Sequence, residues 1–341
     1  MRIALDAQLC VGTATGIGEY VRGLAEALKE AGVDIVELSE PGLDPWRFDR
    51  RVLWDQVFLP SRARKAGADL LHCASGTVPF FANVPIVVTV HDLAWTRVQA
   101  HTPPYARYYF GRFSIERYRR AARIAVDSRF SRNELLWVLD GYDPSAIHVV
   151  YPGVAEDFCT LERRGGDGRT ILVVGTVERR KNLGAVIAAL PSLPGARVLA
   201  VGPSTPYQDE CYHLAASLGV ADRIEFLGYV PRVRLLQLYS TCGVVAMPSR
   251  YEGFGYAAAQ ALCSGVPCVV SDRSSLPEVA GNDGRVVAID DQPALIDALA
   301  RTLAGEDDAR AAAVRERAIA RFSWLTSARS MEQVYRAALG T

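Results

Sequence analysis

Residues 248–256 read PSRYEGFGY, and an alanine-rich run, AAAQALCSG, follows at residues 257–265. The apolar segment 244–247 before them is typical of a buried strand, and Pro248 ends it. Two glycines then flank one aromatic residue, and the alanines favour a helix. The stretch therefore predicts a strand, a tight turn and a helix whose N-terminal N–H groups can bind an anion or hydroxyl groups.

Length and composition narrow the class of protein. A chain of 341 residues predicts two domains, because single cores stop growing at roughly 250–300 residues. Lys and Arg number 38, as do Asp and Glu, so no overall charge favours nucleic acid. The seven cysteines are scattered without a Cys-x-x-Cys pair, which favours buried thiols in a reducing cytosol over metal ligands. Asp6 interrupts the first apolar run, and no stretch approaches the ~20 apolar residues of a membrane span. We expect a cytoplasmic protein, soluble or at most peripheral at the inner face of the membrane.

Twelve short apolar runs alternate with helical patterns in two blocks. They lie at 3–5, 35–38, 70–72, 86–90, 124–126 and 147–150, then at 171–174, 198–201, 224–226, 244–247, 268–270 and 286–289. Such alternation predicts parallel sheets covered on both faces, with ligands at the carboxyl ends of the strands. Residues 155–169 carry charges and glycines without periodicity, which is typical of a linker. The predicted fold is α/β, with two Rossmann-like doubly wound domains, 1–154 and 170–325, facing across a cleft.

Several polar groups follow predicted strands in the first block. The loop VGTATGIG at 11–18 lacks the G-x-G-x-x-G spacing of a dinucleotide site. Gly16 and Gly18 fit either a tight turn or amides that touch a phosphate. His91 and Asp92 follow the strand 86–90. They either have a functional role at this strand end or cap the next loop. Ser128 also ends a strand, where it can contact an acceptor or cap a helix, and the capping-box spacing of 131–134 predicts a helix that starts there.

Residues 105–123 interleave aromatic side chains with arginines. The aromatic residues are Tyr105, Tyr108, Tyr109, Phe110, Phe113 and Tyr118, and the arginines are Arg107, Arg112, Arg117, Arg119, Arg120 and Arg123. A helix of this kind fits an anionic membrane surface. It fits equally well a helix that buries its aromatic residues and solvates its arginines.

The second block begins with a cationic turn. After the strand 171–174, the chain reads GTVERRKNL at 175–183, so that three consecutive cations precede a predicted helix. Arginine offers a planar fork and lysine a point charge, and together they suit a diphosphate. This pattern favours a diphosphate site over the alternative, a solvated surface turn. Further on, the strand end at Gly228, Tyr229 and Val230 exposes backbone groups that can read the edge of a nucleobase.

Taken together, these segments resemble the retaining glycosyltransferases of GT-B fold, in particular family 4 with its mannosyl- and glucosyltransferases. Eight landmarks occur in the family's order over essentially the full length. They are TGIGEY at 15–20, VHDL at 90–93, SRFS at 128–131, YPGV at 151–154, VGT at 174–176 with RKNL at 180–183, FLGYV at 226–230, PS at 248–249 with EGFG at 252–255, and SLPEVAG at 275–281. The patterns at 293–303 and 307–339 predict amphipathic helices, and the resemblance implies that the C-terminal helix, residues 326–341, crosses back to the first domain.

The resemblance implies a role for each matching residue. Arg180 and Lys181 correspond to the pair that binds the donor diphosphate and stabilises the leaving group in place of a metal ion, and His91 to a histidine beside the transferred sugar. Glu252 corresponds to the acid that holds the sugar hydroxyls. The implied donor-binding residues are Gly16, Gly18, Gly175, Thr176, Tyr229, Val230, Gly253, Phe254, Gly255 and Gln260, and the implied acceptor-binding residues are Asp92 and Ser128.

Two positions depart from the family's pattern. Gln260 stands where a second glutamate usually grips the donor ribose, and an amide lacks the charge-assisted strength of a carboxylate. Thr176 stands where many relatives carry an arginine, which leaves more of the phosphate binding to Arg180 and Lys181. The Gly-Thr and Arg-Lys-Asn variant resembles mannosyltransferases, so GDP-mannose is the first expected donor and a UDP-hexose the second.

The expected reaction is metal-independent transfer of a hexose, with retention, to a glycan or lipid-linked oligosaccharide in surface polysaccharide synthesis. Only Glu252 is a good candidate carboxylate, which favours front-face transfer over the two-carboxylate route of retaining glycosidases. The alternatives are a hydrolysing epimerase, a phosphorylase, and a degenerate nucleotide-binding partner subunit, which Gln260 favours.

Overall fold

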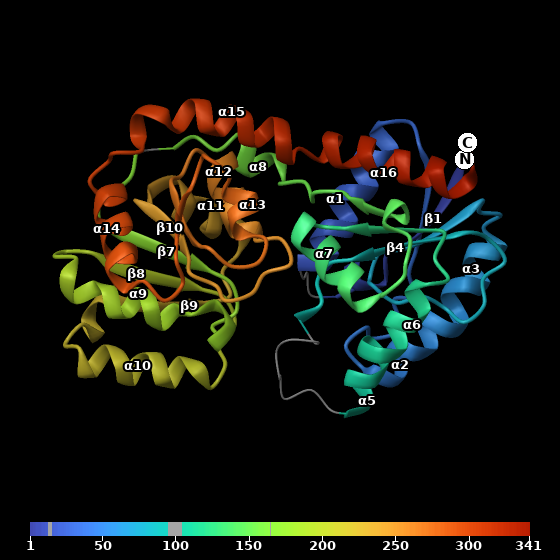
Figure 1. Ribbon diagram of the computed structural model, residues 1–341, viewed down its shortest axis with the longest axis horizontal. Helices are drawn as coiled ribbons and strands as arrows, with labels where there is room; N and C mark the ends of the chain where they lie inside the picture. The colour runs from blue at the N-terminus through green and yellow to red at the C-terminus, as the bar shows by residue number, and fades with distance from the viewer. Residues whose placement is uncertain (13–15, 95–103, 164) are drawn as a thin grey trace. The chain divides into compact units, whose positions relative to one another are not determined.

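The computed structural model describes residues 1–12, 16–94, 104–163 and 165–341. The chain divides into two compact units (Figure 1). Unit 1 contains Met1–Gly153 and Ser323–Thr341, and unit 2 contains Val154–Phe322. Each unit holds one six-stranded sheet whose strands are all parallel. This architecture confirms the predicted α/β fold of two doubly wound domains.

The sheet of unit 1 has the strand order β2-β1-β3-β4-β5-β6. Its strands are β1 (Arg2–Asp6), β2 (Asp34–Leu38), β3 (Leu70–Cys73), β4 (Ile86–Val90), β5 (Arg123–Val126) and β6 (Ile147–Val149). The helices are α1 (Gly16–Glu30), α2 (Phe48–Leu53), α3 (Leu59–Lys65), α5 (Pro104–Arg107), α6 (Ser114–Tyr118), α7 (Arg129–Val138) and α16 (Trp324–Leu339). Alternate residues of a strand face opposite layers. Val87 packs with α1 and α16, and Val88 packs with α3 and α7.

The sheet of unit 2 has the order β12-β11-β10-β7-β8-β9. Its strands are β7 (Thr170–Val174), β8 (Arg197–Val201), β9 (Ile224–Gly228), β10 (Val244–Met247), β11 (Cys268–Ser271) and β12 (Arg285–Val287). The helices are α8 (Glu156–Cys159), α9 (Leu183–Ala189), α10 (Tyr207–Ser217), α11 (Arg232–Thr241), α12 (Tyr256–Cys263), α13 (Leu276–Ala280), α14 (Gln292–Leu303) and α15 (Ala311–Phe322). The strand order reverses between β7 and β10, and doubly wound sheets bind ligands outside the carboxyl ends of strands at such a point.

The C-terminal helix α16 lies beside α1 in unit 1 (Figure 1). Its first residue, Trp324, fits against two glycines, because a Cβ atom at Gly23 or at Gly153 would lie 2.2 Å from the indole ring. Near its end, the Tyr335 hydroxyl lies 2.7 Å from Nδ1 of buried His72. Burial, and then the charge of His91, lower the pKa of His72 to about 3, so the ring is neutral. The polar contact therefore joins α16 to the centre of the sheet.

Four segments differ from the prediction. The expected helix 307–339 is broken at Ser323, whose hydroxyl accepts a hydrogen bond from the Thr326 amide and caps α16. Helix α7 begins at Arg129 with Ser128 as its cap, so the predicted start at Ser131 is wrong. β12 ends at Val287, two residues before the end of the predicted strand. Residues 155–169, expected to form a linker, include α8 and lie in unit 2.

The stretch 105–123 is not one continuous helix. Gly111 has non-helical backbone angles inside the short π-helix Tyr108–Phe113, which lies between α5 and α6. Tyr109 and Tyr118 are buried, as the inward-facing alternative expects, but Arg117 is buried too and donates to the Pro79 carbonyl. Within the described ranges, no helix combines the length and the apolar character needed to cross a bilayer.

Candidate functional site

The carboxyl ends of β7 and β10 bring the predicted cations and acid together in unit 2. After β7, a short 3-10 helix carries Arg180 and Lys181, and after β10 the turn carries Glu252. Lys181 Nζ lies 2.6 Å from Glu252 Oε1, and Arg180 Nη1 lies 3.2 Å from Oε2. One carboxylate therefore binds two cations at the switch point of the sheet.

The backbone fixes the directions of these side chains. Asn182 follows Lys181 in the left-handed conformation, with φ 55°, and thereby separates the cationic turn from α9. Arg180 Nη1 also donates to the Tyr251 carbonyl at 2.6 Å, and its own carbonyl accepts from the Arg250 amide at 2.8 Å. These contacts hold the two turns against each other.

Arg179, the first of the three cations, does not join this group. Its side chain is 76 % exposed, pairs with Glu210 on α10 at 2.7 Å and lies over the Tyr207 ring. Glu178 instead binds Arg180 Nη2 at 2.7 Å. Only two of the three consecutive cations therefore face Glu252, and the sequence alone did not separate them on physical grounds.

The acid is held in its charged form. Burial raises the pKa of Glu252, but the charges of Lys181 and Arg180 outweigh burial and lower it below its ordinary value. The Glu252 side chain is 8 % exposed. A carboxylate in this state accepts hydrogen bonds and does not supply a proton at neutral pH.

The segment before α13 supports the backbone of Glu252. The Ser274 hydroxyl accepts a hydrogen bond from the Glu252 amide at 2.9 Å. The Ser275 hydroxyl contacts the carbonyls of Glu252 and Phe254 at 3.0 and 2.8 Å. Ser274 has a φ of 54°, and among the described residues only Asn182 shares its combination of a side chain and a positive φ. Residues other than glycine with a positive φ are strained, and such residues are found most often at functional sites.

Close backbone approach explains two glycines near the cations. Gly175 has a φ of 135°, and a Cβ atom there would lie 3.2 Å from Lys181 Cε. A Cβ atom on Gly202, at the end of β8, would lie 2.2 Å from the Gly175 carbonyl oxygen. Both positions therefore need glycine to leave room for the lysine and for the turn. Thr176 follows Gly175 in the same turn and is half-buried.

The other predicted donor-binding residues of unit 2 lie at neighbouring strand ends. Gly253, Phe254 and Gly255 are buried between β10 and α12, and Gly255 has a φ of 100° as the residue before the helix. Tyr229 is 70 % exposed and Val230 is half-buried after β9. On α12, the Gln260 carbonyl oxygen lies 3.2 Å from the hydroxyl of buried Tyr239.

Unit 1 places its predicted residues at the carboxyl edge of its own sheet. His91 follows β4, and its Nδ1 lies 2.7 Å from Oδ2 of Asp127 after β5. The sequence assigned Asp127 no role. Asp92 Oδ1 accepts from the Ala94 amide at 3.0 Å. Ser128 is fully buried as the cap of α7, its hydroxyl 3.0 Å from the Ser131 amide.

The glycine loop is described only in part. Gly16 is the first residue of α1 and is exposed, and Gly18 is buried within the helix. The Cys10 thiol contacts the Gly18 carbonyl at 3.4 Å. Thr15, the first residue of the landmark at 15–20, lies outside the described residues, as do residues 13 and 14 of the predicted turn.

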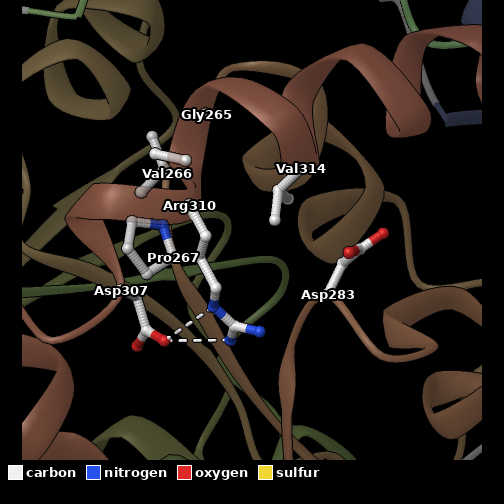
Figure 2. Close-up of a pocket in the computed structure, with 8 residues that line it drawn as sticks. Gly265, Val266, Pro267, Asp283, Asp307, Arg310 and Val314 are labelled. Atoms are coloured by element: carbon white, nitrogen blue, oxygen red, sulfur yellow. Dashed lines mark hydrogen bonds and ion pairs between the residues drawn. The ribbon is translucent and has the colours of Figure 1, made fainter.

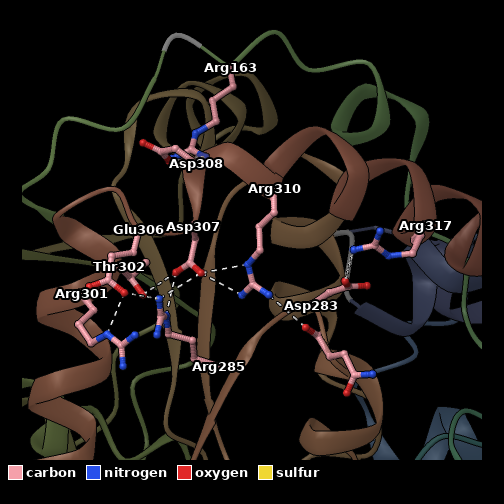
Figure 3. A network of polar contacts seen from close by, with 11 residues as sticks. Arg163, Asp283, Arg285, Arg301, Thr302, Glu306, Asp307, Asp308, Arg310 and Arg317 are labelled. Carbon is pink, nitrogen blue, oxygen red and sulfur yellow. Dashed lines mark hydrogen bonds and ion pairs between the residues drawn. The ribbon is translucent and has the colours of Figure 1, made fainter.

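A hollow in unit 2 lies at the opposite edge of the sheet (Figure 2). Val266 and Pro267 line it just before β11, and Asp283 lines it just before β12, so it faces the amino ends of these strands. Its charged wall belongs to an ion-pair network (Figure 3). There Asp307 binds Arg285 at 2.8 Å and Arg310 at 2.9 Å. This network fastens α15 to the sheet and is separate from the candidate site.

Two family models match the chain. "Glycosyltransferase Family 4" matches residues 14–158, and "Glycosyl transferases group 1" matches residues 162–321. D-inositol 3-phosphate glycosyltransferase of Mycobacteroides abscessus is 31% identical over 276 residues, which are 75% of this chain and 61% of that protein. The Mycolicibacterium smegmatis protein of the same name is 32% identical over 275 residues, 73% of this chain and 62% of that one. The chain thus spans about three fifths of the length of these relatives.

Solved structures share the fold over the whole chain. Sucrose-phosphate synthase of Thermosynechococcus elongatus has a TM-score of 0.77 at 24% identity, covering 100% of this chain and 99% of that one. Anabaena HepE in complex with UDP-glucose has a TM-score of 0.75 at 17% identity, covering 99% and 100%. At sequence identities of 24% and 17%, this structural similarity establishes a shared fold and not a shared function.

The paired acid predicts how the stability of unit 2 depends on pH. Because the pKa of Glu252 is lower in the folded chain, its ion pairs stabilise the fold above pH 4.5, the ordinary value, and this contribution is lost as the pH falls through the folded-state pKa. We expect Glu252→Gln to lower the free energy of unfolding by about 1–3 kcal/mol at pH 7. The difference from the wild type should shrink below pH 4.5.

Urea unfolding between pH 3 and pH 7 measures this difference, with the fluorescence of both variants recorded at each pH. Glu210→Gln is the matched control, because Glu210 pairs with the exposed Arg179 and should contribute at most about 1 kcal/mol. A Glu252→Gln difference that stays constant down to pH 3 would contradict the ion-pair assignment.

Proposed function

The chain belongs to glycosyltransferase family 4, and we propose that it transfers a hexosyl group from a nucleoside diphosphate sugar to a saccharide acceptor with retention of configuration. The observation that carries this proposal is the binding of Glu252 by Arg180 and Lys181 at the switch point of unit 2. Two adjacent cations match the charge of a diphosphate, and a carboxylate matches the hydroxyls of a sugar.

In this proposal, donor binding rearranges the three charged groups. The diphosphate oxygens take over donors of Arg180 and Lys181 that Glu252 holds in the unliganded chain. Glu252, released in part, then accepts hydrogen bonds from hydroxyls of the transferred sugar. As the bond to the anomeric carbon breaks, negative charge grows on the departing phosphate, and the fixed cations stabilise it there. This role requires no metal ion, and metal independence stays a prediction.

The charge and the partners of Glu252 favour front-face transfer. A retaining glycosidase needs one ionised carboxylate as nucleophile and a protonated one as acid. Glu252 is charged, so it cannot be the acid, and its two oxygens bind Lys181 and Arg180, so it is suited to hold hydroxyls rather than to attack the anomeric carbon. We therefore propose that the acceptor oxygen forms the new bond to the anomeric carbon on the face that the phosphate leaves. The departing phosphate oxygen takes the acceptor's proton.

The remaining site residues keep their proposed roles. The turn at Gly175 and Thr176 and the amides of Gly253, Phe254 and Gly255 bind the donor. Tyr229 and Val230 read the nucleobase, and Gln260 contacts the ribose. In unit 1, Gly16 and Gly18 contact phosphate. His91 lies beside the transferred sugar, and Asp92 and Ser128 bind the acceptor. The buried, capping position of Ser128 favours an indirect contribution through α7.

For the donor, two candidates have separate support. The Gly-Thr and Arg-Lys-Asn variant favours GDP-mannose, and a UDP-hexose, the second expected donor, is of the class that HepE holds in its complexes with UDP and UDP-glucose. Thermal unfolding with GDP, UDP, ADP and dTDP distinguishes them, because a ligand at a hundred times its Kd stabilises the fold by about 2.7 kcal/mol. We expect the largest rise in Tm with GDP. A larger rise with UDP would replace mannose by the second candidate, and no rise with any of the four would contradict nucleotide binding.

Two cationic variants test the chemistry. Lys181→Ala should lower kcat by about 10²–10³-fold while circular dichroism stays native, because the charge on the leaving group loses one of its two cations. Arg179→Ala, which removes the adjacent cation that faces α10, should leave kcat close to that of the wild type. Turnover is measured as release of nucleoside diphosphate in the presence of acceptor.

Near-normal transfer by Lys181→Ala would refute the assignment. A wild-type chain that binds a nucleotide but turns over no nucleotide sugar would instead support the degenerate partner subunit. An epimerase would release nucleoside diphosphate and free sugar without an acceptor, so a parallel reaction without acceptor identifies it.

For the acceptor, we propose a glycan or a lipid-linked oligosaccharide of surface polysaccharide synthesis, reached at an anionic membrane. Exposed aromatic residues support membrane contact, since Phe81, Tyr105 and Tyr108 are 83, 56 and 60 % exposed in unit 1, with exposed Arg112 nearby in sequence. Sedimentation with vesicles should show binding that rises with anionic lipid, and Phe81→Ser with Tyr108→Ser should reduce it. Binding that is insensitive to anionic lipid would argue against this contact.

A further inference from the structure

The His91 ring is held from three directions inside unit 1. Its Nδ1 lies 2.7 Å from Asp127 Oδ2, and its Nε2 lies 2.9 Å from the Ala74 carbonyl oxygen. The ring of Tyr20 on α1 meets it edge-on, with centroids 4.8 Å apart. Ala74 follows β3, His91 follows β4 and Asp127 follows β5, so three neighbouring strands fix one imidazole. The His91 and Asp127 side chains are 16 and 5 % exposed.

The two contacts determine where the protons are. A backbone carbonyl can only accept, so Nε2 must carry a proton. The short contact between Nδ1 and Asp127 also needs one proton between the two atoms. The pair therefore holds a proton on each side of the ring, and neither ring nitrogen is free to accept one. A general base needs such a nitrogen within reach of the proton it removes.

The surrounding charges favour the imidazolium form. Burial lowers the pKa of His91, but Asp127 outweighs burial and Asp92 adds to its effect, so the pKa is raised. For Asp127, burial raises the pKa above its ordinary value, the charge of His91 opposes that effect only in part, and the charge of Asp92 adds to burial. Two further titratable groups beside the ring, among the residues that the structure describes, are uncharged: His72 on β3 is neutral, and burial raises the pKa of Tyr20 far above neutrality. Asp127 Oδ1 is buried and finds no hydrogen-bond partner within the described ranges, so the carboxylate interacts mainly with His91.

We propose that Asp127 is a positioning residue that keeps His91 protonated on both ring nitrogens, so that His91 contributes a fixed positive charge and does not act as a general base. The catalytic part of this inference rests on the proposed transferase activity, whereas the protonation state of His91 does not. The inference agrees with a reaction in which the departing phosphate oxygen, and not a histidine, takes the acceptor's proton.

Histidine side-chain NMR on ¹⁵N-labelled protein tests the protonation state. The chain has five histidines, and His91→Gln identifies the signals of His91. We expect both ring nitrogens of wild-type His91 to stay protonated from pH 6 to pH 8. In Asp127→Asn, burial is no longer opposed by the carboxylate, so His91 should titrate at or below the ordinary value of about 6.5. Asp140→Asn, an exposed aspartate of the same unit, is the matched control and should leave His91 unchanged.

Kinetics test the positioning role. Between pH 6 and pH 8, kcat of the wild type should show no ionisation of His91. For Asp127→Asn, kcat should fall about tenfold for each pH unit above the new pKa of His91, while KM for the donor changes little. Asp127→Glu, which restores the charge, should flatten the profile again.

Each outcome bears on a separate claim. A wild-type His91 with one unprotonated nitrogen at pH 7 would overturn the protonation state, even if Asp127→Asn failed to fold. Parallel pH profiles of kcat for wild type and Asp127→Asn would overturn the positioning role. Absence of any transferase activity in the wild type would defeat the proposed function and leave the NMR result standing.

Discussion

The binding of one buried carboxylate by two cations is the interaction on which the candidate site of unit 2 depends. Glu252 lies at the end of β10, and Arg180 and Lys181 follow β7, the strand beside it at which the strand order reverses. A carboxylate buried without partners would be costly, and so would two cations facing each other without an anion. Each group is stable there because the other is present. The same dependence makes the group responsive to a ligand, because an anion that binds the cations changes the partners of Glu252.

Strand positions could be predicted well because parallel strands buried on both faces read as continuous apolar runs. All twelve occur where such runs predict them, with small differences at the ends, as at β12. Helix boundaries were harder, because they depend on single capping hydroxyls. Ser323 interrupts an otherwise continuous helical pattern, and Ser128 caps α7 three residues before the serine that the capping-box spacing favours. Gly111 interrupts the aromatic and basic stretch, which periodicity alone presents as one helix.

In the candidate site, too, some features could be predicted from the sequence and others could not. The strand-end positions of Arg180, Lys181 and Glu252 could be predicted from sequence, because carboxyl ends of neighbouring parallel strands meet at one edge. Their pairing could not, because a pattern of three consecutive cations does not distinguish Arg179, which faces α10, from the two that face Glu252. The partners of His91 were also missed. Ala74 contributes only a backbone carbonyl, which no side-chain pattern reveals, and Asp127 lies 36 residues away along the chain.

Gln260 gains a more specific meaning from the structure than from its departure from the family's pattern. The Tyr239 hydroxyl lies 3.2 Å from its carbonyl oxygen and 3.3 Å from the Ala257 carbonyl, and of these three groups only the hydroxyl carries a proton. The tyrosine is buried and can satisfy its hydroxyl only by donating to one of these oxygens. A glutamate would keep a second, charged oxygen for the hydroxyls of a ribose. A glutamine whose oxygen faces Tyr239 offers its NH₂ group instead, so a ribose hydroxyl would have to accept a hydrogen bond where it would otherwise donate one. For the proposed contact with the donor ribose, glutamine therefore reverses the direction of the hydrogen bond and removes its charge assistance.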